Sequence, residues 1–191
     1  MSHFSKIAWT EGTFLRPQHF QQQERYFSNM QQKCNAMLSL FPWGVSDLEI
    51  DDKATKFSQF GITSLQGILP DGTLLELPMN DLIPSVIEIP KSCREQQVFL
   101  CLAFEKVNSV DIATADSTTI TRYQFSDQLV SDNTLSEESA ELLQVAQLRL
   151  LLKLESEDRG GYIAMPIAKI KEVSEHGEIK LDKKFIPPTI N

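Results

Sequence analysis

The fold is decided by the stretch QVFLCLAFEKV at residues 97–107, the most apolar strand pattern in the chain. Alternate side chains of a β-strand point to opposite faces of a sheet. One face of this stretch carries Val98, Leu100, Leu102 and Phe104, and the other carries Phe99, Cys101 and Ala103. Because both faces are apolar, we expect a central strand that is covered on both sides.

Segments in which apolar and polar residues alternate lie on both sides of this stretch and predict further strands. Pro70-Asp71-Gly72 is typical of a turn and would join two of these strands into a hairpin. Residues 141–154 have two interpretations. Thr134 and Glu137 form a capping box that would begin a helix, whereas alternating apolar residues up to Leu154 favour a strand from about residue 144. The strands are expected at residues 45–51, 57–69, 74–77, 86–89, 97–107, 119–130, 144–154, 162–173 and 179–181.

The beginning of the chain has a helical pattern instead. Pro17 suits a first helical turn, and Phe41-Pro42 ends the segment. Steps of three and four residues connect Phe20, Gln23, Phe27, Met30, Cys34, Met37 and Phe41, of which only Gln23 is polar. We expect this stripe to pack on the chain's own sheet; the alternative is that it also meets partner chains. The sequence thus predicts a mainly β fold, an antiparallel β-sandwich of about eight or nine strands preceded by one N-terminal α-helix.

Composition narrows the class of protein. The chain has 191 residues, with 18 Lys+Arg and 26 Asp+Glu, which gives a net charge of −8. This acidic balance argues against nucleic acid and anionic membrane surfaces. The densest basic cluster, Lys180, Lys183 and Lys184, is interrupted by Glu178 and Asp182. The longest apolar run is far shorter than the roughly 20 residues of a membrane helix, so no membrane insertion is expected.

The cysteines and the first residues indicate the compartment. Cys34, Cys93 and Cys101 are odd in number and form no CxxC pair, which favours buried thiols in a reducing compartment. The opening residues, MSHFSKIAWTEG, contain no apolar run typical of a secretory signal. We therefore expect a cytoplasmic protein.

Motif searches return no catalytic pattern. The sequence contains no G-x-G-x-x-G, no Walker A run and no H-E-x-x-H. His3, His19 and His176 are far apart and match no metal-ligand spacing. No nucleophile, base and oxyanion set is recognisable. We expect no enzymatic activity, no cofactor and no metal.

The segment before the helix is the strongest candidate for a functional site. Between residues 9 and 22 it crowds aromatic and aliphatic side chains beside arginine, histidine and several amides. Such a mixture suits docking across a protein interface. The alternative is a hydrophobic lead-in that fixes the start of the helix to the core. The candidate partner-interface residues are Trp9, Glu11, Phe14, Leu15, Arg16, Gln18, His19, Phe20 and Gln21.

The same segment, WTEGTFLRPQHFQQ at residues 9–22, resembles the opening signature of the TssK family, the trimeric baseplate subunits of the bacterial type VI secretion system. The resemblance spans nearly the whole chain in the family's order. It continues through Trp43-Gly44-Val45, residues 48–51, Leu69-Pro70-Asp71-Gly72-Thr73, Gly161-Tyr162, residues 165–168 and residues 185–188.

This resemblance implies a structural role. Family members have a shoulder, a helical neck and a head, and the shoulder is a β-sandwich like that of phage receptor-binding proteins. The shoulder side attaches to the baseplate wedge proteins TssF and TssG, and the head attaches to the membrane complex. The neck contributes to the homotrimer. By this resemblance, the sequence is expected to end after the shoulder pattern, before the neck and the head.

The resemblance also predicts a division of the chain. Residues 1–16 would be an extended segment, 17–41 the helix, 43–186 the shoulder, and 187–191 the start of a linker to the neck. The alternative function is a glycan- or ligand-binding β-sandwich of a phage-like receptor-binding protein, for which Trp43 beside Gly44 is the only plausible sugar platform. Sequence leaves strand order and oligomeric state open.

Overall fold

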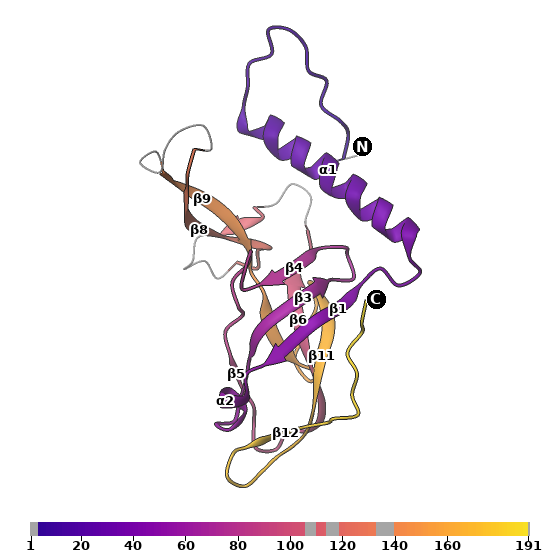
Figure 1. Ribbon diagram of the computed structural model, residues 1–191, viewed down its shortest axis with the longest axis vertical. Coiled ribbons are helices and arrows are strands. Elements are labelled where there is room, and N and C mark those ends of the chain that lie inside the picture. Colours follow the sequence, from indigo (N-terminus) through magenta and orange to yellow (C-terminus); the bar gives the residue numbers. More distant parts are fainter. Residues whose placement is uncertain (1–3, 106–109, 114–118, 133–139, 191) are drawn as a thin grey trace.

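Two antiparallel sheets share one apolar core in the computed structural model, which describes residues 4–105, 110–113, 119–132 and 140–190 (Figure 1). The first sheet has the order β1 (Gly44–Ile50), β3 (Ile62–Ile68) and β4 (Leu74–Leu77). The second has the order β10 (Leu151–Leu154), β6 (Arg94–Ala103), β11 (Tyr162–Val173) and β12 (Ile179–Leu181). Leu65 and Leu75 of the first sheet join Leu100 and Met165 of the second in the core.

Strand β6 is central, as its sequence predicts, because it pairs with β10 on one side and β11 on the other. Val98, Leu100 and Leu102 face the shared core and are fully buried. On the opposite face Cys101 is buried, and the Arg159 guanidinium lies 4.1 Å from the centre of the Phe99 ring. Residues 106 and 107 of the predicted strand lie outside the described residues.

Two smaller sheets extend the predicted pattern. One pairs β2 (Gln59–Phe60) with β5 (Ile87–Glu88), and the other has the order β7 (Ile112–Ala113), β8 (Tyr123–Val130) and β9 (Glu141–Leu148). The predicted mainly β fold of antiparallel strands after one N-terminal helix is thus confirmed, and the described residues form twelve strands in four sheets, more than the eight or nine strands expected. Among the strands that the structure describes, β7 pairs with β8 in parallel and the other strand pairs are antiparallel. A short helix, α2 (Asp52–Thr55), follows β1 and is capped by the Asp51 side chain.

Two predicted strands are each divided. The segment 57–69 breaks at Gly61, where an added Cβ would lie 2.7 Å from Val86 Cγ1, and its two parts join different sheets. The segment 144–154 breaks at Arg149, so that β9 pairs with β8 and β10 pairs with β6. The strand interpretation of this region is confirmed. The residues of the alternative capping box, Thr134 and Glu137, lie outside the described part of the chain.

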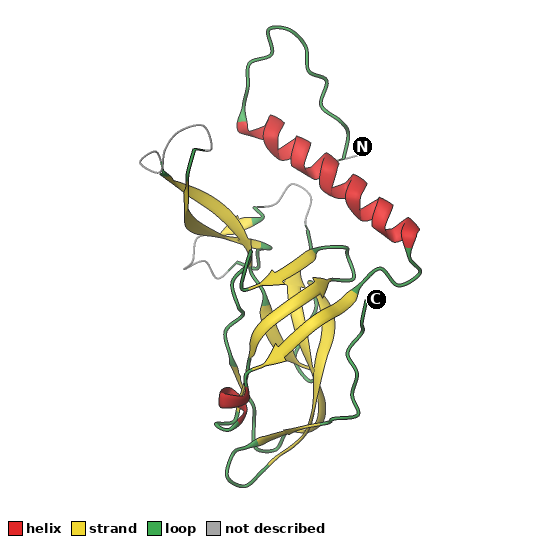
Figure 2. Cartoon of the chain, viewed as in Figure 1, coloured by secondary structure: helices red, strands yellow, loops and turns green. Residues whose placement is uncertain are grey.

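Helix α1 (Pro17–Leu38) lies beyond the edge of the sheets (Figure 2), where its Gln32 side chain approaches Gly72 in the turn between β3 and β4. It ends three residues before Phe41, because Ser39 has extended backbone angles, φ −140° and ψ 144°. None of its 22 residues, all of which are described, is buried. The expectation that its stripe packs on the chain's own sheet is therefore wrong.

The C-terminal segment returns to the start of β1. Val45 N–H donates to Pro188 O at 2.8 Å, and Ile190 N–H donates to Val45 O at 3.2 Å. Gly44 makes this approach possible, since an added Cβ would lie 2.8 Å from the backbone of Pro188. The contact joins two parts of the family signature that are far apart in sequence. That residues 187–191 begin a linker remains a prediction.

Candidate partner interface

The N-terminal segment, residues 4–16, folds back along α1. A turn at residues 10–13 reverses the chain: Thr13 N–H donates to Thr10 O at 3.2 Å, and Gly12 supplies the positive φ of 80°. Further along, Gln22 Nε2 donates to Ser5 O at 2.9 Å. The segment is thereby attached to the helix rather than to the sheets.

Trp9 and His19 form the second attachment. Their rings stack with centroids 5.8 Å apart and an interplanar angle of 29°. His19 is itself fixed at the start of the helix, because the Arg16 N–H donates to its Nδ1 at 3.1 Å. Two of the nine candidate residues therefore hold the segment on the helix.

The other candidate residues remain open. Phe14 is 81% exposed, and Leu15 and Phe20 are more than half exposed. Glu11, Gln18 and Gln21 are exposed as well. No residue between 9 and 22, a range that the structure describes completely, is buried. The alternative of a lead-in fixed to the core is therefore wrong.

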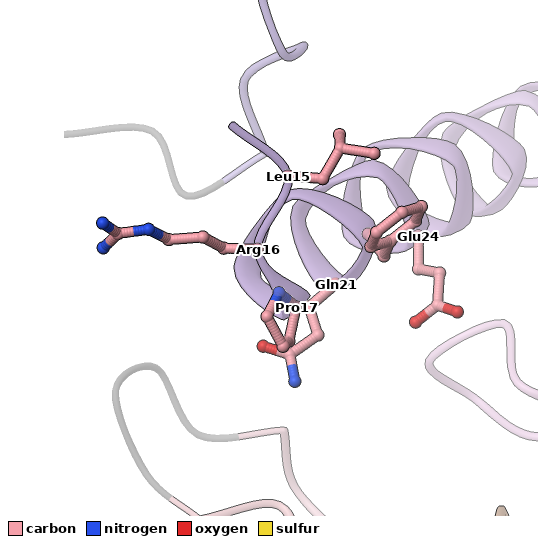
Figure 3. Close-up of a pocket in the computed structure, with 6 residues that line it drawn as sticks. Leu15, Arg16, Pro17, Gln21 and Glu24 are labelled. Atoms are coloured by element: carbon pink, nitrogen blue, oxygen red, sulfur yellow. The ribbon is translucent and has the colours of Figure 1, made fainter. Parts of the chain in front are cut away.

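A shallow pocket of about 400 Å³ lies where the segment meets the helix (Figure 3). Figure 3 shows Pro17 and Gln21 as neighbours at the start of α1, with Arg16 extending away from them. The pocket offers apolar surface beside an amide, a cation and a carboxylate. Its lining residues are Leu15, Arg16, Pro17, Phe20, Gln21 and Glu24.

The apolar stripe continues this open surface along α1. Phe27 and Met30 are about half exposed, and Met37 is 84% exposed. Cys34 is also exposed, which corrects the prediction that all three thiols are buried. Cys93 and Cys101 are buried as expected, and burial raises the pKa of Cys101 to about 11.

A second exposed apolar surface was not predicted from the sequence. Strands β8 and β9 form a ribbon that projects beyond the two main sheets (Figure 1). The consecutive pair Leu142-Leu143 was a usable signal, because adjacent leucines point to both faces of a strand and one of them must be exposed unless both faces are covered. The exposed apolar residues of the ribbon are Phe125, Leu129, Val130, Leu142 and Leu143.

The other surfaces that the structure describes give weaker indications of a functional site. Within the described ranges, no group of three or more His, Cys, Asp or Glu could hold a metal ion. The basic cluster Lys180, Lys183 and Lys184, at and after β12, lines a shallow pocket of about 640 Å³ together with two further lysines and three carboxylates. Among the helices that the structure describes, none is long and apolar enough to cross a membrane. Trp43 is partly buried against the core, so it offers no open platform for a sugar.

A helix with an exposed apolar stripe and a projecting ribbon with exposed apolar residues are typical of a subunit that works by association. Comparison with known proteins identifies the family. The family model T6SS_VasE, described as Bacterial Type VI secretion (EvfL, ImpJ, VasE), matches residues 19–191, and the chain belongs to this family.

Three relatives extend the comparison. The type VI secretion system baseplate component TssK1 of Pseudomonas aeruginosa is 31% identical over 193 residues, which cover 100% of this chain and 43% of the relative. A crystal structure of TssK is similar with a TM-score of 0.88 at 30% identity, covering 98% of this chain and 42% of that one. A TssK–TssF–TssG baseplate subcomplex structure contains a chain with the same fold, with a TM-score of 0.88 at 24% identity, covering 97% of this chain and 62% of that one.

The chain thus spans less than half the length of its curated relative. The family match begins at His19, so the N-terminal segment before α1 precedes it. The similarity to TssK1, in contrast, extends over the whole chain.

Proposed function

We propose that this chain is the shoulder region of a TssK-type baseplate subunit and that it docks onto the baseplate wedge proteins TssF and TssG. A related chain of the same fold is found in a TssK–TssF–TssG subcomplex, which supports this choice of partner. The observation that carries the proposal is the N-terminal segment, which is attached to α1 and presents its apolar side chains outward.

We assign different roles in docking to different residues of the segment. Phe14, Leu15 and Phe20 are the apolar anchors, since aromatic and aliphatic side chains that become buried supply most of an interface's free energy. Arg16, Gln18 and Gln21 form the polar rim together with Glu11. Trp9 and His19 keep the anchors in position through their stacked rings.

The role is structural rather than catalytic. Curated and structural relatives are described as baseplate components, which favours a subunit without enzymatic activity that acts in the cytoplasm. A neck and a head beyond this chain would complete a homotrimer and reach the membrane complex. The proposal assigns these functions to the part of the longer relatives that the chain does not cover, since it matches 43% of TssK1.

A pull-down with co-expressed TssF and TssG tests the proposal. Phe14→Ala and Trp9→Ala are each expected to weaken wedge capture by about tenfold or more, because each removes a large contact or its support. Phe57→Ala is the matched control, since Phe57 is also exposed but lies beside α2 at the other end of the molecule. Far-UV circular dichroism should be unchanged in all three variants. Equal capture of all three variants and the parent would contradict the proposal.

A further inference from the structure

The outer edge of β9 carries backbone groups that no strand pairs. Among the described strands, β9 is the last of its sheet. The Leu148 N–H points away from β8, because it donates to Asp81 Oδ1 at 2.8 Å. The N–H of Tyr123, opposite Leu148, likewise points outward, to Asp111 O at 2.9 Å. Outward groups recur at every second residue of a strand, so further along β9 the outward N–H and C=O groups are those of Leu142, Gln144 and Ala146.

The loop between β4 and β5 covers one end of this edge. It reaches β9 where Gln147 Nε2 donates to Asn80 O at 3.2 Å. Beyond that contact Gln144 and Ala146 are exposed, and the ribbon projects from the two main sheets (Figure 1). A strand edge with unpaired backbone groups is a template for a further strand.

Both faces of the ribbon are apolar. Leu129 lies directly opposite Leu142 on one face, and both are exposed. Val130 and Leu143 lie on the other face and are exposed as well. A two-stranded ribbon alone is marginally stable in water. A strand added at the edge would widen the sheet, and its alternating side chains would extend both apolar faces.

The charges of the ribbon indicate the chemistry of the added strand. Asp127 is the one charged residue of β8, and Glu141 is the one charged residue of β9. Both are exposed, and neither forms an ion pair with another described residue. Two copies of the ribbon would bring together carboxylates without a cation, whereas a lysine or arginine on the added strand would gain a cross-strand attraction.

We propose that the edge of β9 binds an extended segment of a partner protein by strand addition, and that this segment is apolar on alternate residues and carries lysine or arginine beside Glu141. The outward backbone groups supply the main-chain hydrogen bonds, and the side-chain pattern supplies the selectivity. The edge shares no residue with the candidate partner interface before and within α1. Either proposal can therefore fail without the other.

A labelled peptide with the sequence Thr-Val-Lys-Val-Thr-Val-Lys-Val is the probe, and fluorescence anisotropy measures its binding to the chain at low ionic strength. It should bind about tenfold more tightly or more than the same peptide with glutamates in place of the lysines. A lysine peptide methylated on alternate backbone nitrogens keeps the charge but cannot pair along an edge, so it should not bind.

Gln144→Pro blocks the edge. It removes an outward N–H that takes no part in the ladder with β8, and proline is tolerated at such edge positions. Binding of the lysine peptide should weaken about tenfold or more, whereas the matched control Gln144→Ala, which keeps the N–H, should bind like the parent. Glu141→Lys should reverse the preference between the lysine and glutamate peptides. Far-UV circular dichroism should be unchanged in the three variants.

Amide hydrogen exchange measured by NMR reads the edge directly. The amides of Leu143 and Val145 face β8 and should exchange more slowly than those of Gln144 and Ala146. The lysine peptide should slow the outward amides about tenfold or more and leave the inner ones nearly unchanged.

Three results would overturn the proposal. The first is that the lysine peptide does not bind, or binds Gln144→Pro as tightly as the parent. The second is that its binding leaves the outward amides exchanging fast. The third is a larger mass by light scattering for the parent than for Gln144→Pro, which would show that a second copy occupies the edge.

Discussion

Arg122 Nη2 donates to Asp71 Oδ2 at 2.7 Å and joins the residue that precedes β8 to the turn between β3 and β4. The Arg122 side chain is only 4% exposed. Its Nη1 donates to Ala103 O at 2.8 Å, and its Nη2 also donates to Thr73 Oγ1. Burial lowers the pKa of the Arg122 guanidinium and is the largest single influence, but the charge and hydrogen bond of Asp71 together with Tyr123 more than offset it, so the net pKa is raised. The arginine therefore remains charged and depends on its carboxylate partner.

Asp71→Ala is expected to destabilise the chain by about 3 kcal/mol or more, because it leaves a buried guanidinium without its counter-charge. Urea unfolding followed by circular dichroism measures the loss. Asp71→Ala combined with Arg122→Met should recover much of the stability, since the buried charge is then gone. A single variant that unfolds at the parent's midpoint would show that the pair does not hold the turn.

Gly44→Ala tests the contact between β1 and the C-terminal segment. The substitution places a Cβ 2.8 Å from the Pro188 backbone at a residue with φ of 142°. We expect a loss of about 2 kcal/mol or more, measured as a lower melting temperature.

Gly161→Ala is the control for Gly44→Ala. Gly161 also has a positive φ, of 91°, but no atom outside its chain neighbours lies within 4 Å of an added Cβ. It should therefore show the cost of backbone strain alone, about 1 kcal/mol. Equal losses for the two variants would mean that the Pro188 contact contributes nothing.

Local patterns predicted much of the β fold. The bounds expected for β4, β11 and β12 agree with the structure, because alternation and turn residues act over a few neighbours. The division at Arg149 could not be predicted, since residues on both sides of it, Leu148 and Leu150, are buried and continue one pattern across a change of sheet.

Long-range relationships escaped prediction for a different reason. Asp71 has the sequence context of a turn residue, and its partner Arg122 is 51 positions away. The stripe of α1 likewise showed that the helix needs a partner, but an amphipathic pattern does not say which surface supplies it. For the candidate site, sequence located the segment. The structure then separated Trp9 and His19, which attach it, from Phe14 and Phe20, which remain open.

Asp81 should make stability depend on pH. Burial raises the pKa of its carboxyl, the Leu148 N–H bond to Oδ1 at 2.8 Å lowers it, and nearby Glu76 raises it, with a raised pKa as the net result. The folded state then holds the proton more tightly than the unfolded state. Stability is lost as the pH rises from the unfolded pKa, near 3.8, through the folded one.

Asp81→Asn removes this titration and keeps an oxygen that can accept the Leu148 N–H. The variant should therefore gain stability relative to the parent as the pH rises from about 3.5 to 7. Urea midpoints of both proteins across this range provide the measurement. A stability difference that stays constant over the range would show that Asp81 titrates alike in the folded and unfolded chains.

The three cysteines should differ clearly in how fast their thiols react. The thiolate is the reactive form, and burial raises the pKa of Cys101 to about 11 and also raises that of Cys93. Cys34 is exposed on α1. Ellman's reagent at pH 8 should therefore titrate one thiol of three in the native chain. All three should react in denaturant. Cys34→Ser should leave no fast-reacting thiol in the native chain. A second fast-reacting thiol in the parent would mean that the sheet around β6 opens far more readily than its packing indicates.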